Sequence, residues 1–159
     1  MTRVRTLFVA GCLGLGASSN AWALLQSCTV SGVPVGFGVY NPLSPVATFA
    51  TGTVTVECTA TGIGLFEYWT IALSQGNSGS FNNRKMLNGS SPLSYNLYTS
   101  AAYNSIWGDG SGSTTLVNGG ALLSVGTTDT PYTVYGRIPA GQDSAAGTFT
   151  DTIVVTLNF

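Results

Sequence analysis

The strongest constraint on this chain is a two-residue alternation of apolar and polar side chains, most regular in GTFTDTIVVTLNF at 147–159. Asp151 and Val154 are the exceptions to it. Such a period is typical of a strand with one buried face. The apolar parity consists of Phe149, Ile153, Val155, Leu157 and Phe159. We therefore expect a half-buried strand here, whose outer edge needs a partner.

Shorter alternating runs recur along the chain, and turn-forming stretches separate them. The runs are GVPVGFGVY, GTVTVEC, YWTIALS, LSYNLYT, ALLSV and YTVYGRI, and the turns include YNPLSP, SQGNSGSFNN, WGDGSGS and VNGG. No stretch combines the three-and-four apolar spacing of an amphipathic helix with helix caps. About seven short strands predict an all-β fold, an antiparallel sandwich or barrel.

The N-terminus has the pattern of a secretory signal peptide. Arg3 and Arg5 precede the apolar stretch LFVAGCLGLGA, and AWA at 21–23 is a small-x-small cleavage site. These eleven residues are too few for a membrane span, which needs roughly 20. A lipid-anchor signal ending at Cys12 is an alternative. We expect residues 1–23 to be removed and residues 24–159 to form one exported domain.

Charge and composition exclude several functions. After cleavage, three basic side chains stand against six acidic ones, which argues against a nucleic-acid surface. The chain has no histidine, so the Ser-His-Asp and Cys-His arrangements are absent. Asp109 opens a glycine turn that lacks the further carboxylates of a calcium loop. We expect no enzyme, no cofactor and no metal site.

Cysteines and tryptophans give more specific expectations. Cys28 and Cys58 remain after cleavage, and a pair in an exported chain predicts a disulfide, with two free thiols as the alternative.

Trp69 lies on an alternating run and is expected in the core. Trp107 adjoins a glycine loop, where it is a candidate surface aromatic for sugar binding or a core residue.

Six pieces of the chain, in this order, resemble the spore coat protein U domain family. They are FGVYNP (37–42), GTVTVEC (52–58), IALSQGNSGSFNNRKM (71–86), YNLYT with WGDG (95–99 and 107–110), YGRIPAGQ (135–142) and the run at 147–159. The family includes subunits of the archaic chaperone-usher pili of Gram-negative bacteria. The two cysteines match its disulfide.

This resemblance implies an incomplete immunoglobulin-like sandwich that lacks its last strand. The gap would be a groove that accepts a strand from a periplasmic chaperone, and in the fibre from a neighbouring pilin after passage through an outer-membrane usher. The run at 147–159 would form one wall, with its five apolar residues inward. Val33, Val35, Phe37 and Val39 would form the other wall.

The implied function is that of a structural pilus subunit at the cell surface, active in adhesion or biofilm formation. Only Leu24 to Ser27 would precede Cys28 after cleavage. Four residues are shorter than a donor strand of about 10 residues at roughly 3.3 Å each, so we expect a subunit that accepts a strand, as at a tip or in a minor position. The alternatives are a secreted spore or cell coat protein and a carbohydrate-binding module.

The signal peptide leads to a direct prediction. The exported protein is expected to begin at Leu24, which N-terminal sequencing of the secreted material will read. A start well upstream, or a lipid on Cys12, would contradict this assignment and would leave room for a longer leader before Cys28.

Overall fold

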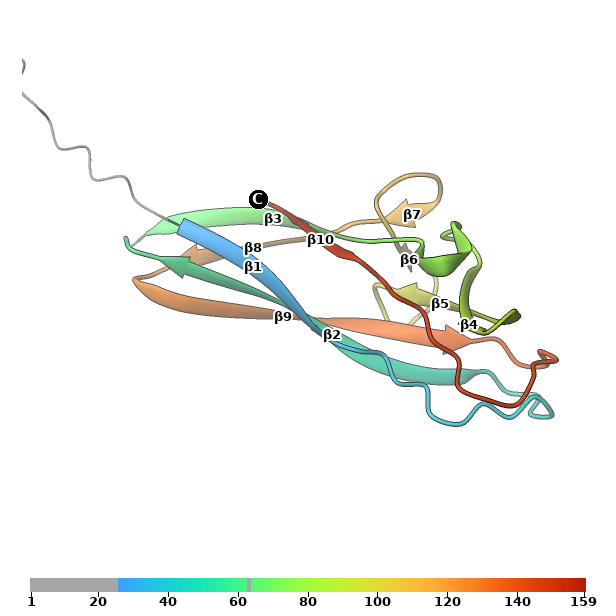
Figure 1. The fold of residues 1–159 in the computed structure, drawn as a ribbon. Coiled ribbons are helices and arrows are strands. Elements are labelled where there is room, and N and C mark those ends of the chain that lie inside the picture. Colours follow the sequence, from blue (N-terminus) through green and yellow to red (C-terminus); the bar gives the residue numbers. More distant parts are fainter. Residues whose placement is uncertain (1–25, 63) are drawn as a thin grey trace, which may run out of the picture.

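A computed structural model describes residues 26–62 and 64–159, which form two packed antiparallel sheets (Figure 1). The signal peptide, Cys12 and the cleavage site lie outside these residues. The strands are β1 (Gln26–Val33), β2 (Thr48–Ala60), β3 (Leu65–Leu73), β4 (Arg84–Asn88), β5 (Ser91–Tyr98), β6 (Ile106–Trp107), β7 (Thr114–Thr115), β8 (Val117–Leu123), β9 (Gly126–Ile138) and β10 (Val155–Asn158). The predicted all-β sandwich is confirmed.

The larger sheet has the order β1-β2-β9-β5-β6-β7, with β4 paired to β5, and the smaller sheet has the order β10-β3-β8. The short β6–β7 pair is parallel and the other strand pairs are antiparallel. Among the described residues the helical structure is one 3₁₀ turn, η1 (Gly76–Ser78). None of it is long and apolar enough to cross a membrane.

The core lies between the sheets, and the alternation seen in the sequence supplies it. On β2 the buried side chains are Val54, Val56, Cys58 and Ala60, one parity of the strand. From the smaller sheet, β3 contributes Trp69, Ile71 and Leu73. The Trp69 indole N–H donates to the hydroxyl of Tyr132 on β9 at 2.9 Å. Trp69 is thus a core residue, as expected, and it joins the two sheets.

The run GVPVGFGVY departs from the strand that its alternation predicts. β1 begins earlier, at Gln26, and ends at Val33, and residues 34–40 belong to no strand. Pro34 has no N–H to donate to a ladder. Val35 instead packs onto Gly52 and Gly136, where an added Cβ would approach it to 2.8 and 2.6 Å. The segment therefore leaves the sheet edge and lies against the inner face of β2 and β9.

The expected disulfide between Cys28 and Cys58 is present. The two residues face each other across the β1–β2 pair, with their Cα atoms 4.1 Å apart. β1 is an edge strand with β2 as its neighbour in the sheet. The disulfide therefore fixes the edge strand covalently to the body of the sheet.

A buried cation, Arg84, organises the end of the sandwich near η1. Its side chain is 0% exposed. The guanidinium donates to the carbonyls of Ser74 and Trp107 and to the amide oxygen of Asn96, at 2.7–3.0 Å. Burial lowers the pKa of Arg84, and the charge of Asp151 acts in the opposite direction. Arg84 thus binds three segments that are separate in the sequence.

The first prediction from this fold concerns the disulfide. Its loop spans a separation of 30 residues, and in the chain-entropy description its loss costs about 3 to 4 kcal/mol of unfolding free energy. Urea unfolding of the protein with and without dithiothreitol measures this cost. A difference below about 1 kcal/mol would show that the edge is held by other contacts.

The second prediction concerns Arg84. In Arg84→Met the carbonyls of Ser74 and Trp107 lose a charged donor inside the core, so we expect a loss of about 3 kcal/mol of unfolding free energy. Lys85→Met at the next position, where the side chain is only partly buried, is the control, with an expected change within about 0.5 kcal/mol. Equal effects of both variants in urea unfolding would contradict this role.

Candidate functional site

The candidate site is the gap between β1 and β10, which are edge strands of different sheets. The two strands run beside each other on one side of the sandwich (Figure 1). β1 pairs with β2, β10 pairs with β3, and no pairing joins β1 to β10 in the described part of the chain. Within the described residues, the backbone ladders therefore leave these two edges unjoined along this side of the sandwich.

The backbone of β10 directs hydrogen-bonding groups into the gap. Ser74 donates its N–H to the carbonyl of Val154 at 2.9 Å, and the N–H of Val154 donates to Oγ of Ser74 at 2.9 Å. Val154 thus faces β3. Because successive residues of a strand direct their polar groups to opposite edges, Ile153, Val155 and Leu157 direct theirs to the gap. The side chains of these three residues also pack against the core.

β1 presents the same arrangement from the other side. The separation of 4.1 Å between the Cα atoms of Cys28 and Cys58 is typical of a non-hydrogen-bonded pair, for which about 4.5 Å is usual against about 5.5 Å for a bonded one. The backbone groups of Cys28 and, by parity, Val30 therefore point away from β2. Both edges of the gap thus combine unpaired backbone groups with inward apolar side chains.

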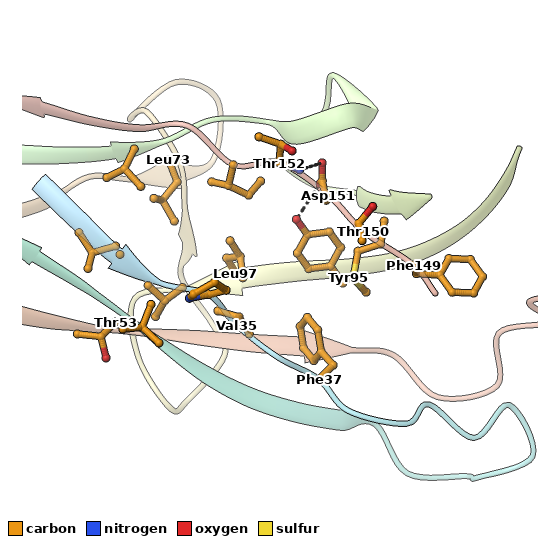
Figure 2. A pocket seen from close by; sticks show the side chains of 18 residues that line it. Val35, Phe37, Thr53, Leu73, Tyr95, Leu97, Phe149, Thr150, Asp151 and Thr152 are labelled. Atoms are coloured by element: carbon orange, nitrogen blue, oxygen red, sulfur yellow. Dashed lines mark hydrogen bonds between the residues drawn. The ribbon is translucent and has the colours of Figure 1, made fainter. Parts of the chain in front are cut away.

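A groove of about 480 Å³ adjoins the gap, and the residues of the two edge strands that line it are Gly32 and Val33 of β1 and Val155 of β10 (Figure 2). One wall is residues 32–35 with Phe37, and the other is residues 149–153 with Val155. The floor consists of Thr53, Val54, Leu73, Met86, Tyr95, Leu97 and Val134. A second hollow of about 590 Å³ shares Val35, Phe37, Met86 and Phe149 with the first. The two hollows are therefore neighbours, and both linings are mainly apolar.

The structure brings most of the predicted wall residues to this groove. Phe149, Ile153 and Val155 line one side of it, and Val33, Val35 and Phe37 line the other. Leu157 packs against the core farther along β10. Phe159 departs from the expectation, because it lies beyond the end of β10 and is 57% exposed. Val39 departs from it too, at 93% exposed.

Sequence reasoning missed the floor of the groove. Met86, Tyr95 and Leu97 come from β4 and β5 and reach the groove only through the packing of the sheets. It also placed no role on Asp151, which lines the groove. The one available signal was that Asp151 interrupts the alternation of the terminal run.

Trp107 is not a surface aromatic. Its side chain is 0% exposed and its indole N–H donates to the carbonyl of Ile71 at 2.9 Å. The neighbouring Gly108 has no Cβ, which lets this loop pack closely against Thr114. A loop with many glycines is therefore compatible with a fully buried tryptophan. Of the two expectations for Trp107, the core residue is confirmed and the surface aromatic for sugar binding is wrong.

The loop at Asp109 is an exposed turn. The carboxylate of Asp109 accepts the N–H and hydroxyl of Ser111 at 2.9 and 2.6 Å, and these hydrogen bonds lower the pKa of Asp109. Within 26–62 and 64–159, no group of three or more acidic or cysteine side chains is arranged to hold a metal ion.

Comparisons with known proteins agree with this geometry. Residues 16–156 match the Spore Coat Protein U domain. The chain is 33% identical over 141 residues to Protein U of Myxococcus xanthus. This alignment covers 80% of this chain and 73% of that protein.

Among solved structures, the fold is similar to a chain of the CsuC–CsuE chaperone–tip adhesion subunit pre-assembly complex from archaic chaperone-usher Csu pili of Acinetobacter baumannii. The TM-score is 0.56 and the sequence identity is 21%. The superposition covers 85% of this chain and 40% of the other, so this chain spans two fifths of that chain's length. Since the domain match takes in most of the sequence, the chain belongs to the Spore Coat Protein U domain family.

Proposed function

We propose that this protein is a structural subunit of an archaic chaperone-usher pilus, and that its groove accepts an extended strand from another polypeptide. The observation that carries the proposal is that β1 and β10 are edge strands with no partner across the gap among the described residues, and that an apolar groove begins where β1 ends and β10 starts. An added strand would satisfy the backbone groups of Cys28 and Val30 on one side and of Val155 and Leu157 on the other. Alternate side chains of that strand would enter the groove.

The unpaired edges and the apolar groove also indicate which partners the protein needs. An open edge over an apolar groove pairs with other chains and promotes aggregation, so a strand must fill it from the time of export. We propose that a periplasmic chaperone supplies that strand before assembly and a neighbouring pilin supplies it in the fibre, with an outer-membrane usher at the cell surface. Similarity of the fold to a chaperone–subunit complex supports this proposal. The role is non-enzymatic, and adhesion or biofilm formation is the expected outcome.

A coat protein is the second candidate, and the description of the matching family, the Spore Coat Protein U domain, favours it. It would use the same sandwich without an usher. Genes for a periplasmic chaperone and an outer-membrane usher beside the gene for this protein would support the pilus. Their absence would support the coat.

Strand acceptance can be tested with the mature chain and a labelled peptide of about ten residues in which valine and threonine alternate, the length of an ordinary to long strand. We expect the peptide to bind and to slow hydrogen exchange at the amides of Ile153, Val155 and Leu157. The amide of Val154 already faces β3, so its exchange should change little.

The strand itself offers a matched pair of variants. Val155→Asp places a carboxylate in the groove wall and should weaken peptide binding more than about tenfold, because a buried unpaired charge costs several kcal/mol. Val154→Asp, on the 60% exposed side chain next to it, should change binding less than about twofold. Strand addition at this site would be refuted if both variants weakened peptide binding equally. It would also be refuted if the peptide did not slow hydrogen exchange at the gap-facing amides.

A further inference from the structure

Asp151 is the residue of the groove wall that the proposed function does not yet explain. It shares the parity of Phe149, Ile153 and Val155, and it lines the groove with them. A carboxylate there is unexpected, because a charged group buried in an apolar wall is costly unless it is paired. The hydrogen bonds of the Asp151 carboxylate provide the pairing that this charge needs.

The carboxylate of Asp151 is tied to three places. Oδ2 accepts the hydroxyl of Tyr95 at 2.7 Å. Oδ1 accepts the backbone N–H of Asn77 and that of Thr152, each at 2.8 Å. Gly76 makes room for it, since a Cβ at that position would overlap the carboxylate. The groove wall is thus held both to the 3₁₀ turn η1 and to β5.

Tyr95 connects this wall to the opposite one. Its side chain lies in the floor of the groove, 5% exposed, and its ring packs edge-on against Phe37 with the ring centroids 5.8 Å apart. Figure 2 shows Phe37, Tyr95 and Asp151 in sequence across the groove. The Tyr95–Asp151 hydrogen bond therefore sets the position of one wall relative to a side chain that contacts the other.

The surroundings of the Tyr95–Asp151 hydrogen bond keep Tyr95 as its donor. Burial, and next to it the hydrogen bond to Asp151, raises the pKa of Tyr95 well above its ordinary value, so Tyr95 stays a protonated donor at neutral pH. The buried guanidinium of Arg84 is attracted to Asp151 without a direct ion pair in the described part of the chain. A buried positive charge behind the wall thus offsets the negative charge in it.

Two further attachments bracket Asp151. Thr150 exchanges backbone hydrogen bonds with Leu87 of β4 at 2.8 and 3.1 Å, and Val154 is bonded to Ser74. The bonds of Val154 leave the wall toward the end of β3, and those of Thr150 leave it toward β4. Between the two attachments, the side chain of Asp151 connects the wall to the floor.

We propose that Asp151 and Tyr95 are a positioning pair for strand acceptance, which holds the wall at 149–153 at the spacing an incoming strand requires before that strand arrives. This inference rests on the proposed function. An acceptor that is already in its bound shape loses less conformational entropy on binding. Without the pair, the wall would have to be ordered by the strand itself, and binding would weaken and slow.

The test compares Tyr95→Phe and Asp151→Asn with the wild type in binding of the alternating valine–threonine peptide. Both variants keep the approximate size of the side chain. Tyr95→Phe removes the hydrogen bond to Asp151, and Asp151→Asn replaces the charged acceptor by an amide whose oxygen can still accept the N–H groups of Asn77 and Thr152. We expect each to weaken binding about tenfold, mainly through a slower association rate. The double variant should lose no more than about the larger single loss, because the two groups act as one unit. Tyr135→Phe and Asp129→Asn, whose side chains line neither of the two hollows, are the matched controls and should bind within about twofold of the wild type.

Urea unfolding and amide exchange in the β2–β9 ladder establish that every variant is folded. Unchanged peptide binding in Tyr95→Phe and Asp151→Asn, with only a lower urea midpoint, would overturn the inference and leave the pair as a purely structural tie. Failure of the wild type itself to bind peptide would instead refute strand acceptance, and the positioning role with it. The two failures are therefore distinguishable.

Discussion

Unsatisfied backbone along the open side of the sandwich is the constraint on which the rest of this structure depends. β1 and β10 each have a neighbour on one side and face the gap on the other. Polar backbone groups at a buried edge need partners, and the apolar floor beneath them would otherwise contact water. Under the proposed function, an added strand completes the sandwich by filling this gap.

Several separate features fix the positions of the two strands that border the gap. The Cys28–Cys58 disulfide anchors β1 to β2. Arg84 binds the carbonyl of Ser74, and Ser74 in turn binds Val154 at the start of the opposite edge. These contacts lie on the far side of each edge strand. The walls are therefore held from behind, and their inner edges are left free for a partner.

The terminal run illustrates how far pattern reasoning reaches. Its parity placed Phe149, Ile153 and Val155 on one inward face, because alternation alone determines which side chains share a face of a strand. The family resemblance implied that this face is a groove wall, and all three residues line the groove. It misplaced Phe159, since a pattern does not show where pairing stops. For the run at 32–40, alternation predicted a strand, yet Pro34 and the contact of Val35 with Gly52 and Gly136 draw the segment off the sheet edge.

The sequence by itself determined the all-β class, the cysteine pair and the inward face of the terminal strand. These depend on local periodicity and composition, which need no knowledge of distant neighbours. Only the tertiary structure decided that Trp107 is buried, that Tyr95 and Met86 form the floor, and that Asp151 meets Tyr95 across 56 positions of sequence. Such contacts arise from how two sheets pack, and packing joins residues that no local pattern relates.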